Sequence, residues 1–358
     1  MTKGPEIDTH GYRRRIALSV AALATLSAGH VCAQGAQERY NAACAACHGS
    51  DGRGRTATQL GFETSIPDFT DCDFAAREPD ADWFAIIHDG GPVRGFVEMM
   101  PAFGLALDDD EIASILGHVR TFCTNADWPR GDLNMPRALF TEKAYPEDEA
   151  VIEGTFNTID ETGTTFNFLW EQRFGTRNQM EISLPISRAE APNGGTVTGA
   201  GDLAVGVKHV LRHSHANGSI LSVGGEIILP TGNSSDGFGK DTTIFEPYVS
   251  FGKLFGEAAF VQVQAKAEYA ADSALNDEYA VRAALGRTWT SNGPFGRSWT
   301  PMIELLAARE RESGAETHWD VVPQFQVSLN TRQHVLAAFG LRLPVNDRDA
   351  RDTEIVMY

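Results

Sequence analysis

The stretch that decides the fold of most of this chain is Phe260–Tyr269, which reads FVQVQAKAEY. Glutamine, lysine and glutamate alternate there with valine and alanine, so a strand over these residues has one polar and one apolar face. The same period of two recurs in Phe166–Phe174 and Trp319–Ser328. About twelve such segments follow residue 150, joined by turns that contain Gly, Asn, Asp or Ser, and they predict an all-β antiparallel domain.

Two architectures could use these strands. A soluble β-sandwich buries the apolar face, whereas an outer-membrane barrel turns that face to lipid and fills its lumen with the polar face. About twelve strands of about ten residues favour the outer-membrane-type barrel, since sandwiches usually have about seven to nine strands. The mid-strand charged residues expected to face the lumen are Glu171, Arg173, Glu181, Lys208, Glu226, Glu246, Lys266, Glu268, Arg282, Glu304 and Arg342. Charges of both signs predict internal ion pairing and a narrow or closed pore, because wide channels usually need about sixteen strands or more.

The first 33 residues have the pattern of a secretory signal peptide. Three arginines at 13–15 precede an apolar stretch over 16–28, and small residues at 31 and 33 allow a cut ahead of Gln34. A short membrane anchor is the rival interpretation, but this stretch is too short to span about 30 Å of hydrocarbon. Export places the remaining cysteines in an oxidising compartment.

The sequence predicts a multidomain chain. We expect a signal peptide at 1–33, a small all-α domain at 34–124, a Pro-rich and charged linker at 125–149 and the barrel at 150–358. The net charge of −18 argues against a nucleic-acid partner, because binding to phosphates depends on Lys and Arg. No apolar run is long enough for a membrane-spanning helix.

Cys44, Cys47 and His48 form the motif C-x-x-C-H. Two thiols three residues apart on a helical turn can each add to a vinyl group of a porphyrin, and the following histidine can then bind the iron. A redox dithiol or half of a zinc site would leave His48 unexplained, and no second C-x-x-C completes a zinc site. The motif therefore predicts one covalently bound haem c with iron.

Residues 35–123 resemble the class I cytochrome c family. Tyr40 lies four residues before Cys44, and glycines at 49, 52 and 54 follow the motif as an open loop. Asp108 and Glu111 form a capping-box pair that begins a last helix with apolar residues at helical spacing. The resemblance implies a small all-α electron carrier rather than an enzyme.

The same resemblance implies a thioether as the sixth iron ligand, from a Met that precedes a Pro. Met100 and Pro101 fit, with Met99 and His88 as the alternatives. Ligation by His48 and Met100 closes both axial positions of the iron, which suits electron transfer better than peroxidase chemistry.

Cys72 and Cys123 remain once haem has taken two thiols. An even pair in an oxidising compartment predicts a disulfide, and two inert buried thiols are the alternative.

The second part of the chain resembles the outer-membrane β-barrel family associated with aromatic-degradation operons. The similar residues are Gly199–Asp202, which open a strand, and the region Gly224–Gly232. The resemblance implies a barrel of uncertain transport role. The last strand, Arg351–Tyr358, is short and ends in an aromatic residue.

Two functions follow from these patterns. The first is a haem electron carrier tethered to outer-membrane lipid by its barrel, relaying electrons between a periplasmic redox protein and the outer membrane. The second is an outer-membrane pore or solute channel with a haem-containing gating or sensor domain. One haem cannot form a chain of centres across an apolar band about 25 Å tall, so a redox partner is implied.

Overall fold

The computed structural model describes residues 35–158, 163–190, 194–256, 258–272, 275–290, 298–349 and 351–358. The expected signal peptide lies outside these residues. The chain divides into two compact units, one made of residues 1–75 and 102–124 and the other of residues 76–101 and 125–358. No helix within the described ranges combines the length and the hydropathy that a membrane crossing requires.

The first unit is helical. It contains a helix over residues 35–43, α2 (Ala45–His48), α3 (Ala57–Leu60) and α6 (Asp109–Arg120), and α4 (Cys72–Arg77) runs across its boundary. The expected capping box is confirmed, because the Asp108 side chain accepts from the Glu111 amide and the Glu111 side chain accepts from the Asp108 amide. The buried face of α6 consists of Ile112, Ile115, Leu116 and Val119, in agreement with the predicted helical spacing.

The second unit contains the β-sheet, with α5 (Asp80–Asp89), η1 (Gly91–Arg94), η2 (Gly131–Leu133) and η3 (Ser234–Asp236). The strands are β1 (Glu149–Asn157), β2 (Thr164–Phe174), β3 (Asn178–Glu190), β4 (Thr196–Ala200), β5 (Leu203–Ser214), β6 (Ser219–Leu229), β7 (Ile244–Phe255), β8 (Ala259–Ala270), β9 (Glu278–Arg287), β10 (Trp289–Thr290), β11 (Ser298–Glu310), β12 (His318–Ser328), β13 (Leu336–Pro344) and β14 (Glu354–Met357).

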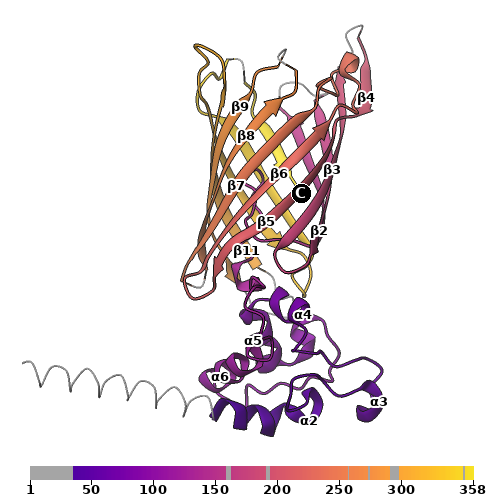
Figure 1. Cartoon of the computed structure of the whole chain (residues 1–358), viewed down its shortest axis with the longest axis vertical. Coiled ribbons are helices and arrows are strands. Elements are labelled where there is room, and N and C mark those ends of the chain that lie inside the picture. The colour runs from indigo at the N-terminus through magenta and orange to yellow at the C-terminus, as the bar shows by residue number, and fades with distance from the viewer. Residues whose placement is uncertain are drawn as a thin grey trace, which may run out of the picture. The chain divides into compact units, whose positions relative to one another are not determined.

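These strands close into an antiparallel barrel (Figure 1). Both β4 and β5 pair with β3, and both β9 and β10 pair with β11, so the fourteen segments form twelve barrel strands. Closure comes from β1, which pairs with β2 on one side and with β14 on the other, where Gly154 lies opposite Met357. The closed sheet confirms the predicted barrel over the sandwich, and the short last strand completes it.

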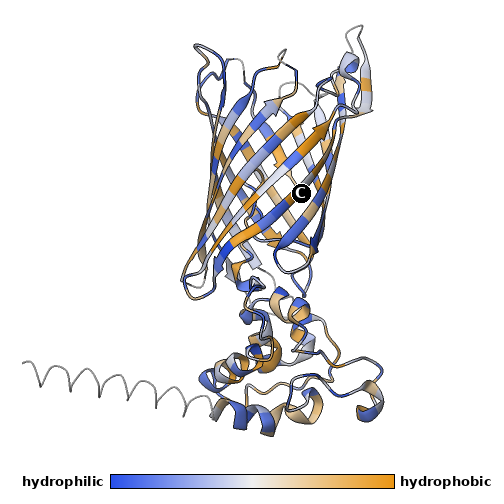
Figure 2. Cartoon of the chain, in the orientation of Figure 1, coloured by the Kyte–Doolittle hydropathy of each residue, from blue (hydrophilic) through white to orange (hydrophobic). Residues whose placement is uncertain are grey.

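The two faces of the barrel differ in polarity, as the alternation in the sequence predicts. Large apolar side chains such as Trp170, Ile303 and Phe325 are exposed on the outside, and each is more than 40% accessible. Orange and blue residues accordingly alternate along the strands in Figure 2. Of the charged residues expected inside, those that are buried are Glu171, Arg173, Glu181, Lys208, Glu246 and Glu304.

Residues 131–148, here called the luminal segment, lie inside the barrel rather than beside it. Buried Glu304 of β11 accepts hydrogen bonds from the amides of Phe140 and Thr141, at 3.1 and 2.8 Å. Elsewhere on the wall, the Ser222 hydroxyl of β6 donates to the carbonyl oxygen of Ala144. The stretch expected as a linker thus supplies part of the barrel core.

Candidate haem site

The two cysteines of the C-x-x-C-H motif lie on one helical turn. Cys44 caps the N-terminus of α2, and the amides of Cys47 and His48 donate to the Cys44 carbonyl oxygen at 3.1 and 2.9 Å. Both thiols are free and half-buried. Burial raises the pKa of the Cys44 thiol to about 11, and the nearby Cys47 adds to the shift. The turn therefore presents two free thiols at the spacing that a covalently attached porphyrin requires.

His48 has the properties of a neutral metal ligand. Burial lowers the pKa of its imidazole to about 4, so the ring carries no proton charge at neutral pH. Its ring stacks on Phe69, with the centroids 4.9 Å apart. Nδ1 is buried and has no hydrogen-bond partner within the described ranges. A half-buried, neutral imidazole beside two free thiols fits a haem group.

The loop after the motif is held against the end of α2. The Gly54 amide donates to the His48 carbonyl oxygen at 2.8 Å, and the Arg55 amide donates to that of Cys47 at 2.9 Å. Gly54 has φ +74°, and a Cβ atom there would lie 3.0 Å from the Ile66 carbonyl oxygen. Only glycine suits this position, because an L side chain would be strained and crowded.

The first and last helices of this unit pack together. Tyr40 is fully buried and its hydroxyl donates to the Gly49 carbonyl oxygen at 2.8 Å. Its ring contacts His118 and Phe122 of the last helical region, with centroids 5.2 and 5.3 Å apart. Neither His118 nor the Phe69 ring beside His48 was expected, because no motif or period in the sequence links these residues to the site.

The remaining cysteines confirm the predicted disulfide. Cys72 and Cys123 are bonded, with their Cα atoms 5.1 Å apart. The bond ties the start of α4 to the residues that follow α6. Among the described residues, Cys44 and Cys47 are the free cysteines that are left.

Met100 belongs to the second unit, in the loop that follows η1. Its carbonyl oxygen accepts from the Gly91 amide at 3.0 Å. A Cβ atom on Gly91 would lie 2.6 Å from the Val97 carbonyl oxygen, so this loop packs tightly on η1. Of the alternatives, Met99 is half-buried and His88 pairs with neighbouring Asp89 at 2.7 Å. Met100 as the sixth ligand stays a prediction.

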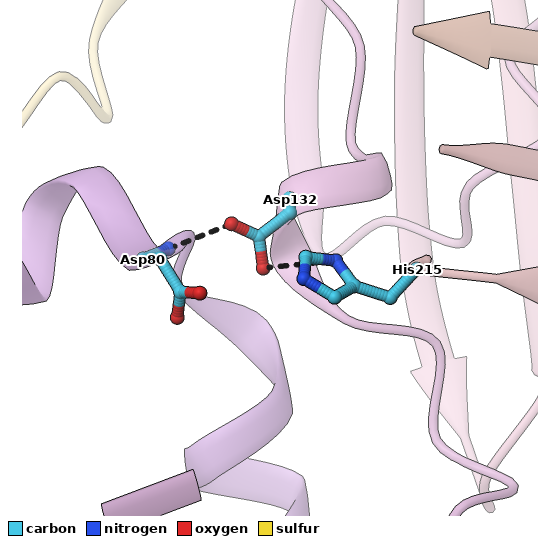
Figure 3. A group of neighbouring side chains, drawn as sticks. All are labelled: Asp80, Asp132 and His215. Carbon is cyan, nitrogen blue, oxygen red and sulfur yellow. Dashed lines mark hydrogen bonds and ion pairs between the residues drawn. The ribbon is translucent and has the colours of Figure 1, made fainter. Parts of the chain in front are cut away.

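A second group of ligand-type side chains lies in the second unit: Asp80, Asp132 and His215 (Figure 3). The Asp80 amide donates to Asp132 Oδ1 at 2.9 Å, and His215 Nδ1 lies 3.8 Å from Asp132 Oδ2. The guanidinium of Arg130 pairs with both carboxylates. The positive charge beside the two carboxylates is thus supplied by Arg130. The group links α5 to η2 and to the turn between β5 and β6.

Comparison with known proteins finds a family match in the helical part of the chain. Residues 33–119 match the family described as cytochrome C oxidase, cbb3-type, subunit III. No curated protein matches the chain. The chain thus carries a cytochrome c domain of the cbb3 subunit III type, and the strands that follow it form a twelve-strand barrel.

Three solved structures illustrate the likeness of the barrel. An outer membrane channel from Pseudomonas putida F1 has a TM-score of 0.40 at 14% identity, covering 62% of this chain and 97% of its own. The KdgM porin has a TM-score of 0.37 at 10% identity, covering 58% and 97%. The NanC porin has a TM-score of 0.33 at 11% identity, covering 58% and 98%. At this distance, the roles of individual residues come from this chain alone.

Proposed function

We propose that this protein is an electron carrier in which one haem c is attached through Cys44 and Cys47 and ligated by His48 and Met100. The observation that carries the proposal is the turn of α2, which presents two free thiols and a neutral, half-buried imidazole in C-x-x-C-H order. A bound haem c would supply a one-electron centre, whose potential is raised by His and Met ligation.

The residues of the chain would attach the group and hold it in place. Cys44 and Cys47 would bind it covalently, while the stacked Phe69 ring restricts rotation of the His48 imidazole. The hydrogen bond from Gly54 to the His48 carbonyl keeps the end of α2 in place. Ligands that are held rigidly would change little in geometry when the iron is reduced, which favours rapid electron transfer.

We propose that the barrel is embedded in the outer membrane and that its outward face contacts lipid. Exposed Val281, Leu285 and Leu305 belong to a continuous apolar surface around the strands. Burial of such a surface in hydrocarbon is favourable, whereas in water it would promote aggregation. The buried acidic and basic residues face the opposite side, as the lumen of such a barrel requires.

The barrel would act as an anchor rather than an open channel, because the luminal segment is packed on both sides. Leu133, Met135 and Tyr145 form a buried cluster with inward-facing Ile220 and Phe260. Hydrogen bonds with Glu304 and Ser222 hold the same segment to two separate strands of the wall, β11 and β6. Removal of a luminal segment that is held by both apolar and polar contacts would be strongly unfavourable. This supports a barrel that anchors the haem domain over a barrel that acts as a gated pore.

The haem domain would accept an electron from a periplasmic redox protein or donate one to it. The net charge of −18 would attract a basic partner at low salt. A net charge of this sign does not favour binding to a nucleic acid.

The test combines cell fractionation with spectroscopy. Haem-loaded protein is expected in the outer-membrane fraction, with a visible spectrum that titrates reversibly with one electron. Purified barrels in planar bilayers are expected to show negligible conductance. Protein that stays monodisperse in plain buffer without detergent would refute the membrane barrel, and a steady open conductance would favour the solute channel.

A further inference from the structure

Three carboxylates meet inside the barrel, and they come from three separate parts of the chain. Glu142 belongs to the luminal segment, Glu171 to β2 and Glu181 to β3, and one oxygen of each lies within 4.8 Å of the others. Oxygens that share one Ca²⁺ at about 2.3–2.6 Å lie no more than about 5 Å apart. The three side chains therefore already have the spacing of ligands around one cation.

A fourth carboxylate, that of Glu226 on β6, lies close to this group. Gly206 of β5 pairs with Glu181 on one side and with Glu226 on the other. A Cβ atom on Gly206 would lie 2.7 Å from Glu181 Oε1 and 2.8 Å from Glu226 Cγ. The glycine thus leaves the space in which two carboxylates from non-adjacent strands approach each other.

The cationic side chains of the lumen do not balance these charges. Lys208 Nζ binds Glu142 at 2.5 Å, and Arg137 binds Glu171 but also Glu149. Within the described part of the chain, Glu181 and Glu226 form no ion pair. Buried carboxylates that form no direct ion pair are unfavourable in their charged form, so a bound cation or protons would neutralise them.

A buried hydroxyl without a partner provides an independent sign of a ligand. Tyr248 of β7 is 3% exposed, and its hydroxyl has no hydrogen-bond partner among the described residues. In the sheet, Tyr248 lies opposite Gly224, which lies opposite Lys208. The Tyr248 ring covers Gly224, so that the hydroxyl is directed toward Lys208 and the carboxylate that it binds.

Space for an ion with its water molecules adjoins these groups. A cavity of about 270 Å³ is lined by three of the four carboxylates, those of Glu142, Glu181 and Glu226. Arg137 and Arg282 line it as well. A polar cavity of this size holds several waters, which complete the coordination of large hard cations.

We propose that the lumen binds one divalent cation of the calcium class through Glu142, Glu171, Glu181 and Glu226, with Tyr248 close by. The ligands are oxygens, and among the described residues no histidine or cysteine joins the cluster, which favours calcium over zinc. Because Glu142 lies on the luminal segment and the other three on the wall, the ion fastens the segment to the barrel.

The test is calorimetric titration of the full-length, haem-loaded protein in detergent, stripped with EDTA and dialysed, first with calcium chloride and then with magnesium chloride. One calcium per chain is expected to bind, more tightly than magnesium. Glu181→Gln and Glu226→Gln are expected to weaken calcium binding at least about tenfold. Glu268→Gln is the matched control, since Glu268 also faces inward but pairs with Lys266 at 2.8 Å, and it should bind as the wild type does.

The folding of each variant is checked by the change in its electrophoretic mobility when the sample is heated. Tyr248→Phe provides a further variant, which leaves every carboxylate in place. This variant is expected to bind calcium several-fold more weakly while folding normally. No calcium uptake by the wild type, or wild-type affinity in Glu181→Gln, would overturn the proposal. In that case the carboxylates share protons instead, which a protonated-carboxyl infrared band at neutral pH would reveal. These measurements do not depend on haem chemistry, so their failure leaves the electron-carrier proposal intact.

Discussion

The hydroxyl of Tyr358 donates a hydrogen bond to the carbonyl oxygen of Arg137 at 3.1 Å. The side-chain amide of Gln326, on β12, donates to the same hydroxyl at 2.5 Å. The aromatic residue after the closing strand therefore contacts the luminal segment rather than lipid. One tyrosine links the wall of the barrel, its closure and its interior.

Removal of both haem-binding thiols should abolish covalent haem attachment. In Cys44→Ala with Cys47→Ala, a denaturing gel stained for haem should show no signal, whereas the wild type keeps its signal because thioether bonds survive denaturation. Acid-acetone extraction provides the complementary measurement. Haem that is extracted from the wild type would show that no thioether bond exists.

Replacement of the predicted sixth ligand should leave one coordination position of the haem iron free for an added ligand. Met100→Ala is expected to remove the near-infrared sulfur-to-iron band of the oxidised protein and to allow added imidazole to bind, because the thioether would be gone. Met99→Ala is the matched control and should keep the band. If the two variants behave the other way round, the ligand is Met99.

Acid should destabilise the haem-free protein through His48. The folded-state pKa of His48, about 4, lies below the unfolded value near 6.5, so its contribution is present above pH 6.5 and is lost as the pH falls toward 4. The expected loss is about 3 kcal/mol in the free energy of unfolding of the Cys44→Ala, Cys47→Ala variant. Denaturant titrations between pH 7 and 4 measure it. Adding His48→Phe should remove most of this pH dependence, and an unchanged slope would contradict the assignment.

A lysine introduced on the outward face of the barrel should destabilise it far more than a lysine introduced on the inward face. Val263→Lys is expected to destabilise the barrel in lipid vesicles by about 2 to 4 kcal/mol, because the ammonium group would lie in hydrocarbon. Gln264→Lys, one residue along β8, should be tolerated better, since Gln264 is buried in the lumen and accepts from the Glu142 amide at 3.3 Å. Urea unfolding in vesicles compares the two, and equal costs would argue against a lipid-facing surface at Val263.

Loss of the Glu304 carboxylate should loosen the luminal segment. Glu304 is fully buried and accepts from the Phe140 and Thr141 amides, the Thr141 hydroxyl and the Gln324 side chain. Glu304→Ala leaves these donors unpaired, which should cost about 2 to 3 kcal/mol and raise conductance in planar bilayers. Glu304→Gln, which keeps an acceptor oxygen, should have a smaller effect. Unchanged conductance in Glu304→Ala would mean that other contacts suffice to hold the segment.

The features that the sequence predicts correctly depend on local patterns. The alternation in Phe260–Tyr269 sets the two faces of β8, and the Asp108–Glu111 pair sets the start of α6, because each signal lies within one element. The position of the luminal segment inside the barrel could not be predicted from its own sequence. Its proline and charged residues are typical of a linker, and the residues that bind it are distant in sequence, as Glu304 is 163 residues from Thr141.

Chain order gives the luminal segment a consequence for assembly. Residues 131–148 precede every strand, whereas the pair that closes the barrel, β1 with β14, joins Gly154 to Met357 at opposite ends of the sheet sequence. Contacts so distant in sequence are slow to form, so the wall should close last, around a segment that is already in place. Biogenesis of this barrel is then templated from within, and threading of the segment into a finished cylinder is unnecessary.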